Sequence, residues 1–99
     1  MKLGLLARIE ARPEHAQEVA EMLAGATAIA EKEGHTVTWY AYRLDATTFG
    51  VFDTFADESG RQTHLHGPIA TALMAKAPEL FAKPPSIEPV EILGAKQPG

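Results

Sequence analysis

Short segments rich in apolar and β-branched residues alternate along the chain with longer segments of helical periodicity. The short segments cover residues 3–10, 36–44, 47–55 and 86–93. Their content of Val, Ile, Thr, Tyr, Phe and Trp, together with the turn-forming residues between them, is typical of β-strands. The sequence therefore predicts four strands.

The first helix is predicted over residues 13–33. Apolar residues recur there every three or four positions and would form one stripe: Val19, Met22, Leu23, Ala26, Ile29 and Ala30. Such a stripe is the signature of a helix that packs one side against a core. Pro13 suits the first turn of a helix, and Gly34 suits the position just after its end.

A second helical region is predicted over residues 58–77. Asp57 precedes it and is a suitable N-cap. Gly67 and Pro68 should break this region into two parts, and Pro78 should end it. Pro89 lies in the last predicted strand, and because proline cannot donate to a strand ladder, it should occupy an edge strand or a bulge.

The order strand, helix, strand, strand, helix, strand defines the split βαβ, or ferredoxin-like, arrangement. It predicts an α+β fold with an antiparallel four-stranded sheet and both helical regions on one face. The 99 residues fit a single domain over residues 1–99, of which residues 94–99 should form a flexible tail.

The central hairpin carries large apolar side chains on both of its faces. A two-residue turn at Asp45 and Ala46 would place one group on one face: Tyr40, Tyr42, Phe49 and Val51. The other face would then carry Trp39, Ala41 and Phe52. Helices can cover only one face, and soluble monomers rarely expose a large apolar patch. We therefore expect a homodimer joined through the uncovered face of the sheet.

Composition and charge exclude several classes of partner and site. The formal net charge of −4 opposes binding to nucleic acid, and the chain has no cysteine for disulfides or a zinc finger. No apolar stretch approaches the roughly 20 residues that cross a bilayer. The N-terminal residues resemble a strand more than a signal peptide, so we expect a cytoplasmic protein.

Two stretches of the sequence resemble the antibiotic-biosynthesis-monooxygenase family. Residues 38–43 read TWYAYR and residues 48–65 read TFGVFDTFADESGRQTHL, similar to the family's second strand, third strand and following helix. In that family an acid precedes an aromatic by two positions and a His-Leu pair follows on the helix. Here Asp53, Phe55 and the pair His64-Leu65 hold those positions. The segment from Arg8 to Pro13 also resembles the family's opening.

The resemblance implies a dimeric α/β barrel in which two sheets pack face to face. The family includes cofactor-free oxygenases of phenolic polyketides and quinols, as well as haem-degrading members. This sequence departs from the commoner pattern by having Asp53 where Glu is usual and Phe55 where Trp is frequent. Its tryptophan, Trp39, lies instead on the second predicted strand.

His64, Asp53 and Arg43 are the candidate catalytic residues. The ordinary pKa of histidine suits His64 to act as a general base. Asp53 would orient it or accept a substrate proton, and Arg43 would stabilise a phenolate. The structural alternatives are a half-buried histidine, an acid bonded to Thr36, Thr38 or a backbone amide, and an ion pair at the rim.

Trp39, Tyr40, Phe52 and His66 are the candidate residues for binding a substrate. The alternative for the aromatic residues is packing in the core or the dimer interface. His64 and His66 form an H-x-H pair, but residues two apart on a helix point in different directions. We therefore expect no metal at this pair.

The sequence lacks the glycine-rich nucleotide-binding motifs, the zinc-protease motif and the nucleophile elbow. A cofactor-free reaction fits best, so the leading hypothesis is a small monooxygenase that oxidises an aromatic phenol or quinol with molecular oxygen. One alternative is a non-catalytic module that binds a small hydrophobic ligand. Another is a haem-binding or haem-degrading protein, which the complete absence of Asn disfavours.

Overall fold

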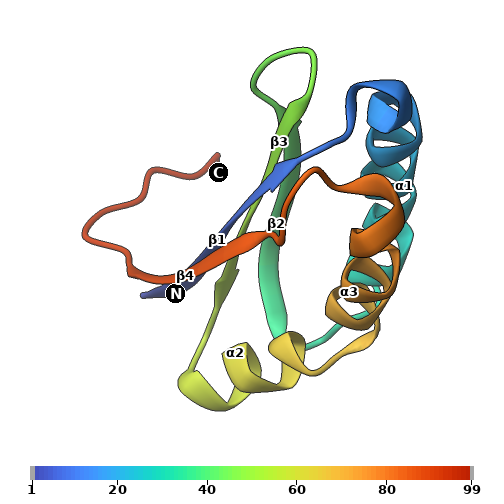
Figure 1. Cartoon of the computed structure of the whole chain (residues 1–99). Coiled ribbons are helices and arrows are strands. Elements are labelled where there is room, and N and C mark those ends of the chain that lie inside the picture. The colour runs from blue at the N-terminus through green and yellow to red at the C-terminus, as the bar shows by residue number, and fades with distance from the viewer. Residues whose placement is uncertain (1, 99) are drawn as a thin grey trace.

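The computed structural model describes residues 2–98 and forms an antiparallel sheet with its helices on one face (Figure 1). The strands are β1 (Leu3–Glu10), β2 (Thr36–Arg43), β3 (Thr48–Phe55) and β4 (Ser86–Glu91), in the spatial order β2-β3-β1-β4. The helical elements are η1 (Pro13–His15), α1 (Ala16–Ala30), α2 (Glu58–Leu65) and α3 (Pro68–Leu80). The predicted α+β, ferredoxin-like fold is confirmed.

The helix boundaries differ from the prediction at two places. The first helical segment starts with a 3₁₀ turn and ends at Ala30, three residues earlier than expected. Pro78 lies inside α3 instead of ending it, and the N–H of Phe81 closes the last turn on the carbonyl of Ala77. The predicted cap of α2 is confirmed, because Asp57 Oδ1 accepts the N–H of Gly60 at 2.8 Å.

The hairpin between β2 and β3 closes with three loop residues, not with the two that the sequence predicted. The N–H of Leu44 donates to the carbonyl of Thr48 at 2.8 Å, which leaves residues 45–47 in the loop. Asp45 holds this loop, because its Oδ1 accepts the N–H groups of Thr47 at 3.0 Å and Thr48 at 2.8 Å. One extra loop residue shifts the register between β2 and β3 by one position. Relative to β2, each side chain of β3 then lies on the face opposite to the predicted one.

The predicted grouping of hairpin side chains is therefore wrong. Residues that pair directly across an antiparallel ladder share a face. Trp39 pairs with Asp53, and Tyr40 pairs with Phe52. Trp39, Ala41, Phe49 and Val51 thus lie on the helix-covered face, and Tyr40, Tyr42 and Phe52 lie on the opposite one.

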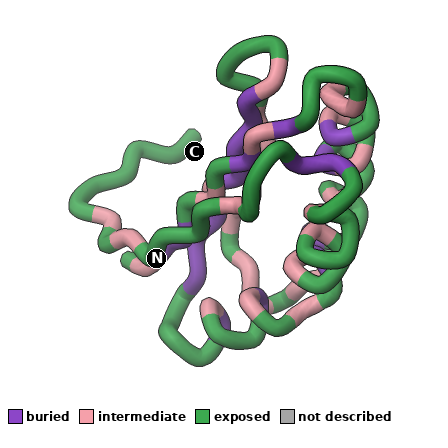
Figure 2. Tube along the Cα trace, in the orientation of Figure 1, coloured by how far each residue is buried: buried purple, intermediate pink, exposed green. Residues whose placement is uncertain are grey.

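The core fills the space between the sheet and α1 and α3. Its largest fully buried side chains come from β1, β3, α1 and the segment after α3: Ile9, Val19, Phe49, Phe55 and Phe81. Figure 2 shows that buried positions gather on the two central strands, β1 and β3, whereas β4 is exposed over most of its length. The two edge strands are β2 and β4, so the edge position predicted from Pro89 is confirmed.

The sheet face away from the helices carries a row of apolar side chains. Tyr40 pairs with Phe52, and Phe52 pairs with Leu6, so the three form neighbours across β2, β3 and β1. Leu6 and Tyr40 are exposed and Phe52 is half-buried. This row is called the outer apolar row below.

After β4, residues 92–98 form neither helix nor strand and extend away from the helix layer (Figure 1). Leu93 in this segment is almost fully exposed. Among residues 2–98, none of the helices combines the length and the apolar character that a membrane span requires.

Candidate functional site

Asp53 is buried beneath the helices, with only 2% of its surface exposed. It lies on β3, and its side chain faces α2 because the alternation of the strand places Phe52 and Thr54 on the other face. A carboxylate in such surroundings requires a partner. The partner is His64, whose Nε2 lies 2.8 Å from Asp53 Oδ2.

His64 lies on the last turn of α2 and has a carboxylate at each ring nitrogen. Its Nδ1 is 2.8 Å from Glu33 Oε1, as its Nε2 is from Asp53. Carboxylate oxygens accept hydrogen bonds, so this arrangement favours the protonated form of the ring, in which both nitrogens donate. Burial by itself lowers the pKa of His64, but hydrogen bonds and charge from Asp53 and then Glu33 raise it above the usual 6.5.

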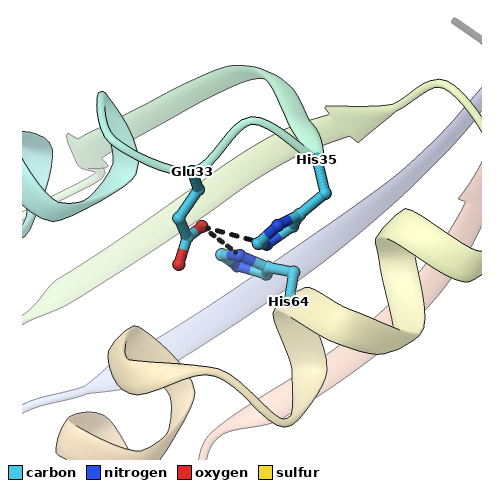
Figure 3. A group of neighbouring side chains, drawn as sticks. All are labelled: Glu33, His35 and His64. Carbon is cyan, nitrogen blue, oxygen red and sulfur yellow. Dashed lines mark hydrogen bonds and ion pairs between the residues drawn. The ribbon is translucent and has the colours of Figure 1, made fainter.

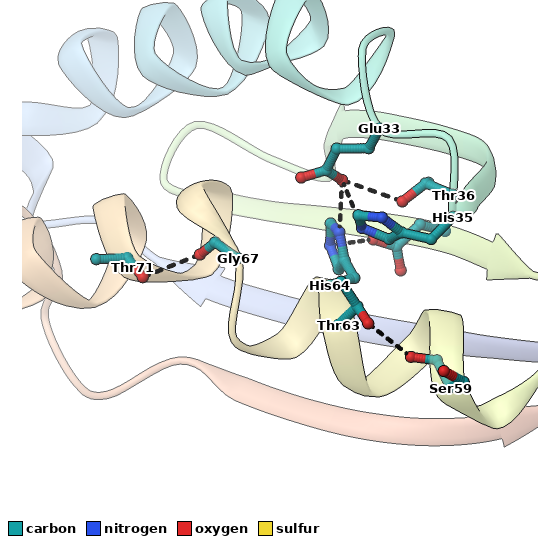
Figure 4. Close-up of polar contacts among 9 residues, drawn as sticks. Glu33, His35, Thr36, Ser59, Thr63, His64, Gly67 and Thr71 are labelled. Carbon is teal, nitrogen blue, oxygen red and sulfur yellow. Dashed lines mark hydrogen bonds and ion pairs between the residues drawn. The ribbon is translucent and has the colours of Figure 1, made fainter.

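Glu33 comes from the turn between α1 and β2, together with His35 and Thr36 (Figures 3 and 4). Thr36 Oγ1 donates to Glu33 Oε1 at 3.0 Å, and His35 Nε2 lies 3.5 Å from the same oxygen. The Glu33 side chain is only 7% exposed. Its second oxygen, Oε2, is buried and has no hydrogen-bond partner among the described residues.

A cavity of about 40 Å³ adjoins the Asp53–His64 pair between the sheet and α2 and α3. Its walls are mostly apolar, and they include Leu5, Val51, Ile69, Leu73, Met74 and Ile87. Trp39 also lines the cavity, and its indole Nε1 is buried without a hydrogen-bond partner among residues 2–98. The cavity therefore offers apolar walls, which include the Trp39 ring, and one carboxylate.

The structure brings together three of the seven predicted site residues: Trp39, Asp53 and His64. Thr36 and Thr38, the partners considered for a purely structural Asp53, bond elsewhere: Thr36 to Glu33, and Thr38 to Thr54 at 2.6 Å.

The other four predicted residues lie outside this cavity. Arg43 packs over the ring of Phe49, 4.8 Å from its centroid, at the hairpin end of the sheet. Tyr40 and Phe52 belong to the outer apolar row, on the opposite side of the sheet: Tyr40 by the alternation of β2, and Phe52 by the register described above. His66 is exposed after α2, and its Nδ1 lies 2.8 Å from the carbonyl of Gln62.

Two residues of the cluster, Glu33 and His35, were not predicted from the sequence. The sequence places Glu33 at the end of the first helix and His35 near the start of a strand, where it predicts a solvent-exposed histidine. In the structure the His35 side chain is half-buried and lies against Glu33. The register supplies the missing signal: Thr36 pairs with Phe55, so the turn before β2 lies beside the segment that leads into α2. The antiparallel pairing thus brings Glu33 to His64 across 31 positions of sequence.

A solved structure from Nitrosomonas europaea, protein NE2512 of unknown function, matches the whole fold. It shares 51% sequence identity with this chain, the match covers 99% of this chain and 95% of that one, and the TM-score is 0.95. The chain belongs to the same family as this Nitrosomonas protein. The matched region includes β3, α2 and the turn before β2, the three segments that carry the site.

More distant structures share the fold alone. A "putative antibiotic biosynthesis monooxygenase" from Deinococcus radiodurans is 17% identical over 98% of both chains, with a TM-score of 0.81. The protein Rv0793 from Mycobacterium tuberculosis is 16% identical over 98% of this chain and all of that one, with a TM-score of 0.84. The predicted resemblance to the monooxygenase family is thus confirmed in its fold. No protein-family model and no curated protein sequence matches the chain.

Proposed function

We propose that the protein is a cofactor-free monooxygenase that oxidises a small phenol or quinol with molecular oxygen. The observation that carries this proposal is the buried Asp53–His64 pair at the wall of an apolar cavity. Proteins of the same fold bear the monooxygenase name, which is consistent with this chemistry.

The reaction balances without another reductant. The substrate hydroxyl gives its proton to the site, and the resulting electron-rich ring reduces oxygen. In a phenol, one oxygen atom replaces the ring hydrogen para to the hydroxyl and the other leaves as water, so a phenol and O₂ give a quinone and H₂O. In a hydroquinone, whose para position is occupied, the oxygen atom replaces a ring hydrogen beside a hydroxyl, so a hydroquinone and O₂ give a hydroxyquinone and H₂O. The substrate supplies all four electrons that O₂ accepts.

Asp53 is the group that we assign to the substrate hydroxyl. Both ring nitrogens of His64 lie 2.8 Å from carboxylate oxygens, so neither nitrogen is free to take a proton from the substrate. His64 instead holds Asp53 in place and offsets its charge. The Trp39 N–H can donate to a substrate oxygen, and the apolar walls limit access of water.

The cavity must widen before it can accept a ring. Its 40 Å³ is far below the roughly 300 Å³ or more of a typical ligand pocket. Met74 and Leu73 on α3 form part of its wall, and methionine is a flexible, unbranched side chain that repacks readily. We therefore propose that α3 side chains move aside when the substrate enters.

A non-catalytic binding module is the second candidate, and the engaged nitrogens of His64 favour it. In that case the same cavity binds a small phenol through Asp53 and Trp39, but no oxygen is consumed. Oxygen uptake and ligand binding, measured separately, distinguish the two candidates.

We also propose that the working form is a homodimer joined through the outer apolar row. The row presents Leu6, Tyr40 and Phe52 on a face that no helix of this chain covers. The segment after β4, with its exposed Leu93, lies on the same side of the sheet (Figure 1) and could contact the partner. Two sheets packed in this way would bury both rows.

The substitution Asp53→Asn is expected to reduce oxygen uptake at least about 100-fold, because loss of a positioned acid or base typically costs 10²–10⁴-fold. The variant should fold, since the Asn carbonyl can still accept the hydrogen bond from His64. Uptake is measured with an oxygen electrode and a panel of hydroquinones and phenols, in buffer containing EDTA.

The matched control is Glu21→Gln at an exposed position of α1, which should retain wild-type uptake. Ligand binding without oxygen uptake by the wild-type protein would support the binding module. If no phenol or quinol is consumed or raises the thermal midpoint, both candidates are wrong.

A further inference from the structure

We propose that Glu33, His35 and His64 bind one divalent transition-metal cation of the Zn²⁺ type. A carboxylate oxygen of Glu33 and one ring nitrogen from each histidine all lie within 4.8 Å of one another. Figure 3 shows the three side chains converging from the turn before β2 and from α2. This proposal goes beyond the oxygenase reaction and does not depend on it.

The ligand atoms are of the right kind and nearly at the right spacing. Two imidazoles and one carboxylate suit zinc and its neighbours, whereas Mg²⁺ and Ca²⁺ prefer oxygen ligands. Glu33 Oε1 lies 2.8 Å from His64 Nδ1 and 3.5 Å from His35 Nε2. With ligand bonds of about 2.0–2.2 Å, a tetrahedral cation needs its ligand atoms roughly 3.3–3.5 Å apart. The cation would thus replace the proton between Glu33 and His64 after a small separation of the two groups.

Two of the three side chains have buried polar atoms with no hydrogen-bond partner among the described residues. These atoms are Glu33 Oε2 and His35 Nε2. The Glu33 side chain is 93% buried, since 7% of it is exposed, whereas His35 retains 26% exposure. His35 Nε2 has only the 3.5 Å contact with Glu33 Oε1, and such incomplete contacts are costly for buried polar groups. A cation shared by the two side chains would bind His35 Nε2 directly and offset the charge of the Glu33 carboxylate.

The neighbours of the three ligands have the roles expected around a metal. A metal-bound histidine usually donates its other N–H to a carboxylate, and His64 Nε2 faces Asp53 Oδ2 at 2.8 Å. The carboxylate ligand is itself held, because Thr36 Oγ1 donates to Glu33 Oε1 at 3.0 Å (Figure 4). Asp53 also adds a second negative charge close to the proposed cation.

A cation can reach the site from solvent without crossing the oxygenase cavity. A surface hollow of about 380 Å³ is lined by Glu33, Gly34, His35 and Pro68, among others. Lys32 also lines this hollow but is exposed, so its charge is screened by water. The proposed site pairs His64 with His35. The H-x-H motif pairs His64 with His66 instead, so its spacing did not indicate this site.

The test is a Zn²⁺ titration of the untagged full-length chain after removal of metal with EDTA and desalting. We expect one Zn²⁺ per chain by calorimetry, an increase in thermal midpoint, and no response to Mg²⁺. Co²⁺ bound in the same place should give the visible absorption of a tetrahedral ion. The substitutions His35→Ala and Glu33→Gln should each weaken Zn²⁺ binding at least about 100-fold, and Asp53→Asn about 10–100-fold.

The matched control is His66→Ala, which removes an exposed histidine two residues from His64 and should bind Zn²⁺ like the wild type. Equal loss in His66→Ala and His35→Ala would indicate a surface site, and the proposal would be wrong. Absence of stoichiometric Zn²⁺ or Co²⁺ binding would also overturn the proposal. Because these measurements involve no oxygen, their outcome is independent of the oxygenase test in EDTA.

Discussion

The substitution Leu6→Lys is expected to raise the dissociation constant of the proposed homodimer by about 100-fold to 10⁴-fold. Leu6 lies at one end of the outer apolar row, beside Phe52, on the face that the dimer would bury. Losing a buried leucine costs about 1.5–3 kcal/mol, and two-fold symmetry applies the change twice. Each 1.4 kcal/mol is a factor of ten in the constant. Sedimentation equilibrium over a concentration series measures the change.

Lysine is chosen because it should not disturb the isolated chain. Position 6 pairs with Glu88 on β4, so a lysine there has an opposite charge beside it. The matched control is Ile29→Lys on α1, because Ile29 and Leu6 are both 39% exposed. Ile29 lies on the helix layer, so this control should remain dimeric. A well-folded wild-type monomer at micromolar concentration would contradict the proposed dimer.

The substitution His64→Leu is expected to lower the free energy of unfolding by about 3–5 kcal/mol. The imidazolium stands between two buried carboxylates, and removing it leaves Glu33 and Asp53 without a compensating charge. Breaking a buried ion pair from one side typically costs this much, because the remaining charge is stranded in a poorly hydrated place. Urea denaturation in EDTA, which removes any metal contribution, measures the loss.

A triple variant tests whether stranded charge is the cause. Adding Glu33→Gln and Asp53→Asn to the His64→Leu chain removes both carboxylate charges, so part of the lost stability should return. The exposed neighbour His66 provides the control, and His66→Leu should change the free energy of unfolding by no more than about 0.5 kcal/mol. If His64→Leu lowers the free energy of unfolding no more than His66→Leu does, the charges of Glu33, His64 and Asp53 do not stabilise the fold.

The order and type of the elements were determined by the sequence, because each depends on contacts that are local in the chain. The stripe that includes Val19, Met22 and Leu23 indicated a helix, because a strand would place Val19 and Met22, three positions apart, on opposite faces. The Asp57 cap and the break at Gly67 and Pro68 act within a few residues, and both are in the structure as predicted. The acid on the third strand and the histidine on the following helix, which the family resemblance singled out, lie in contact in the structure, and their role in a reaction stays a prediction.

The membership of the site was decided by the tertiary structure. A third residue in the hairpin loop, held by Asp45, shifted the register of β3 against β2 and moved Phe52 to the face opposite Trp39 and the cavity. Tyr40 lies on that face because side chains alternate along β2. The antiparallel pairing of β2 with β3 carried Glu33 and His35 to His64, although neither residue shows a local pattern of function. Periodicity predicts which residues share a face of one helix or strand. Strand register and turn length decide which of these faces meet, and both depend on packing across the whole chain.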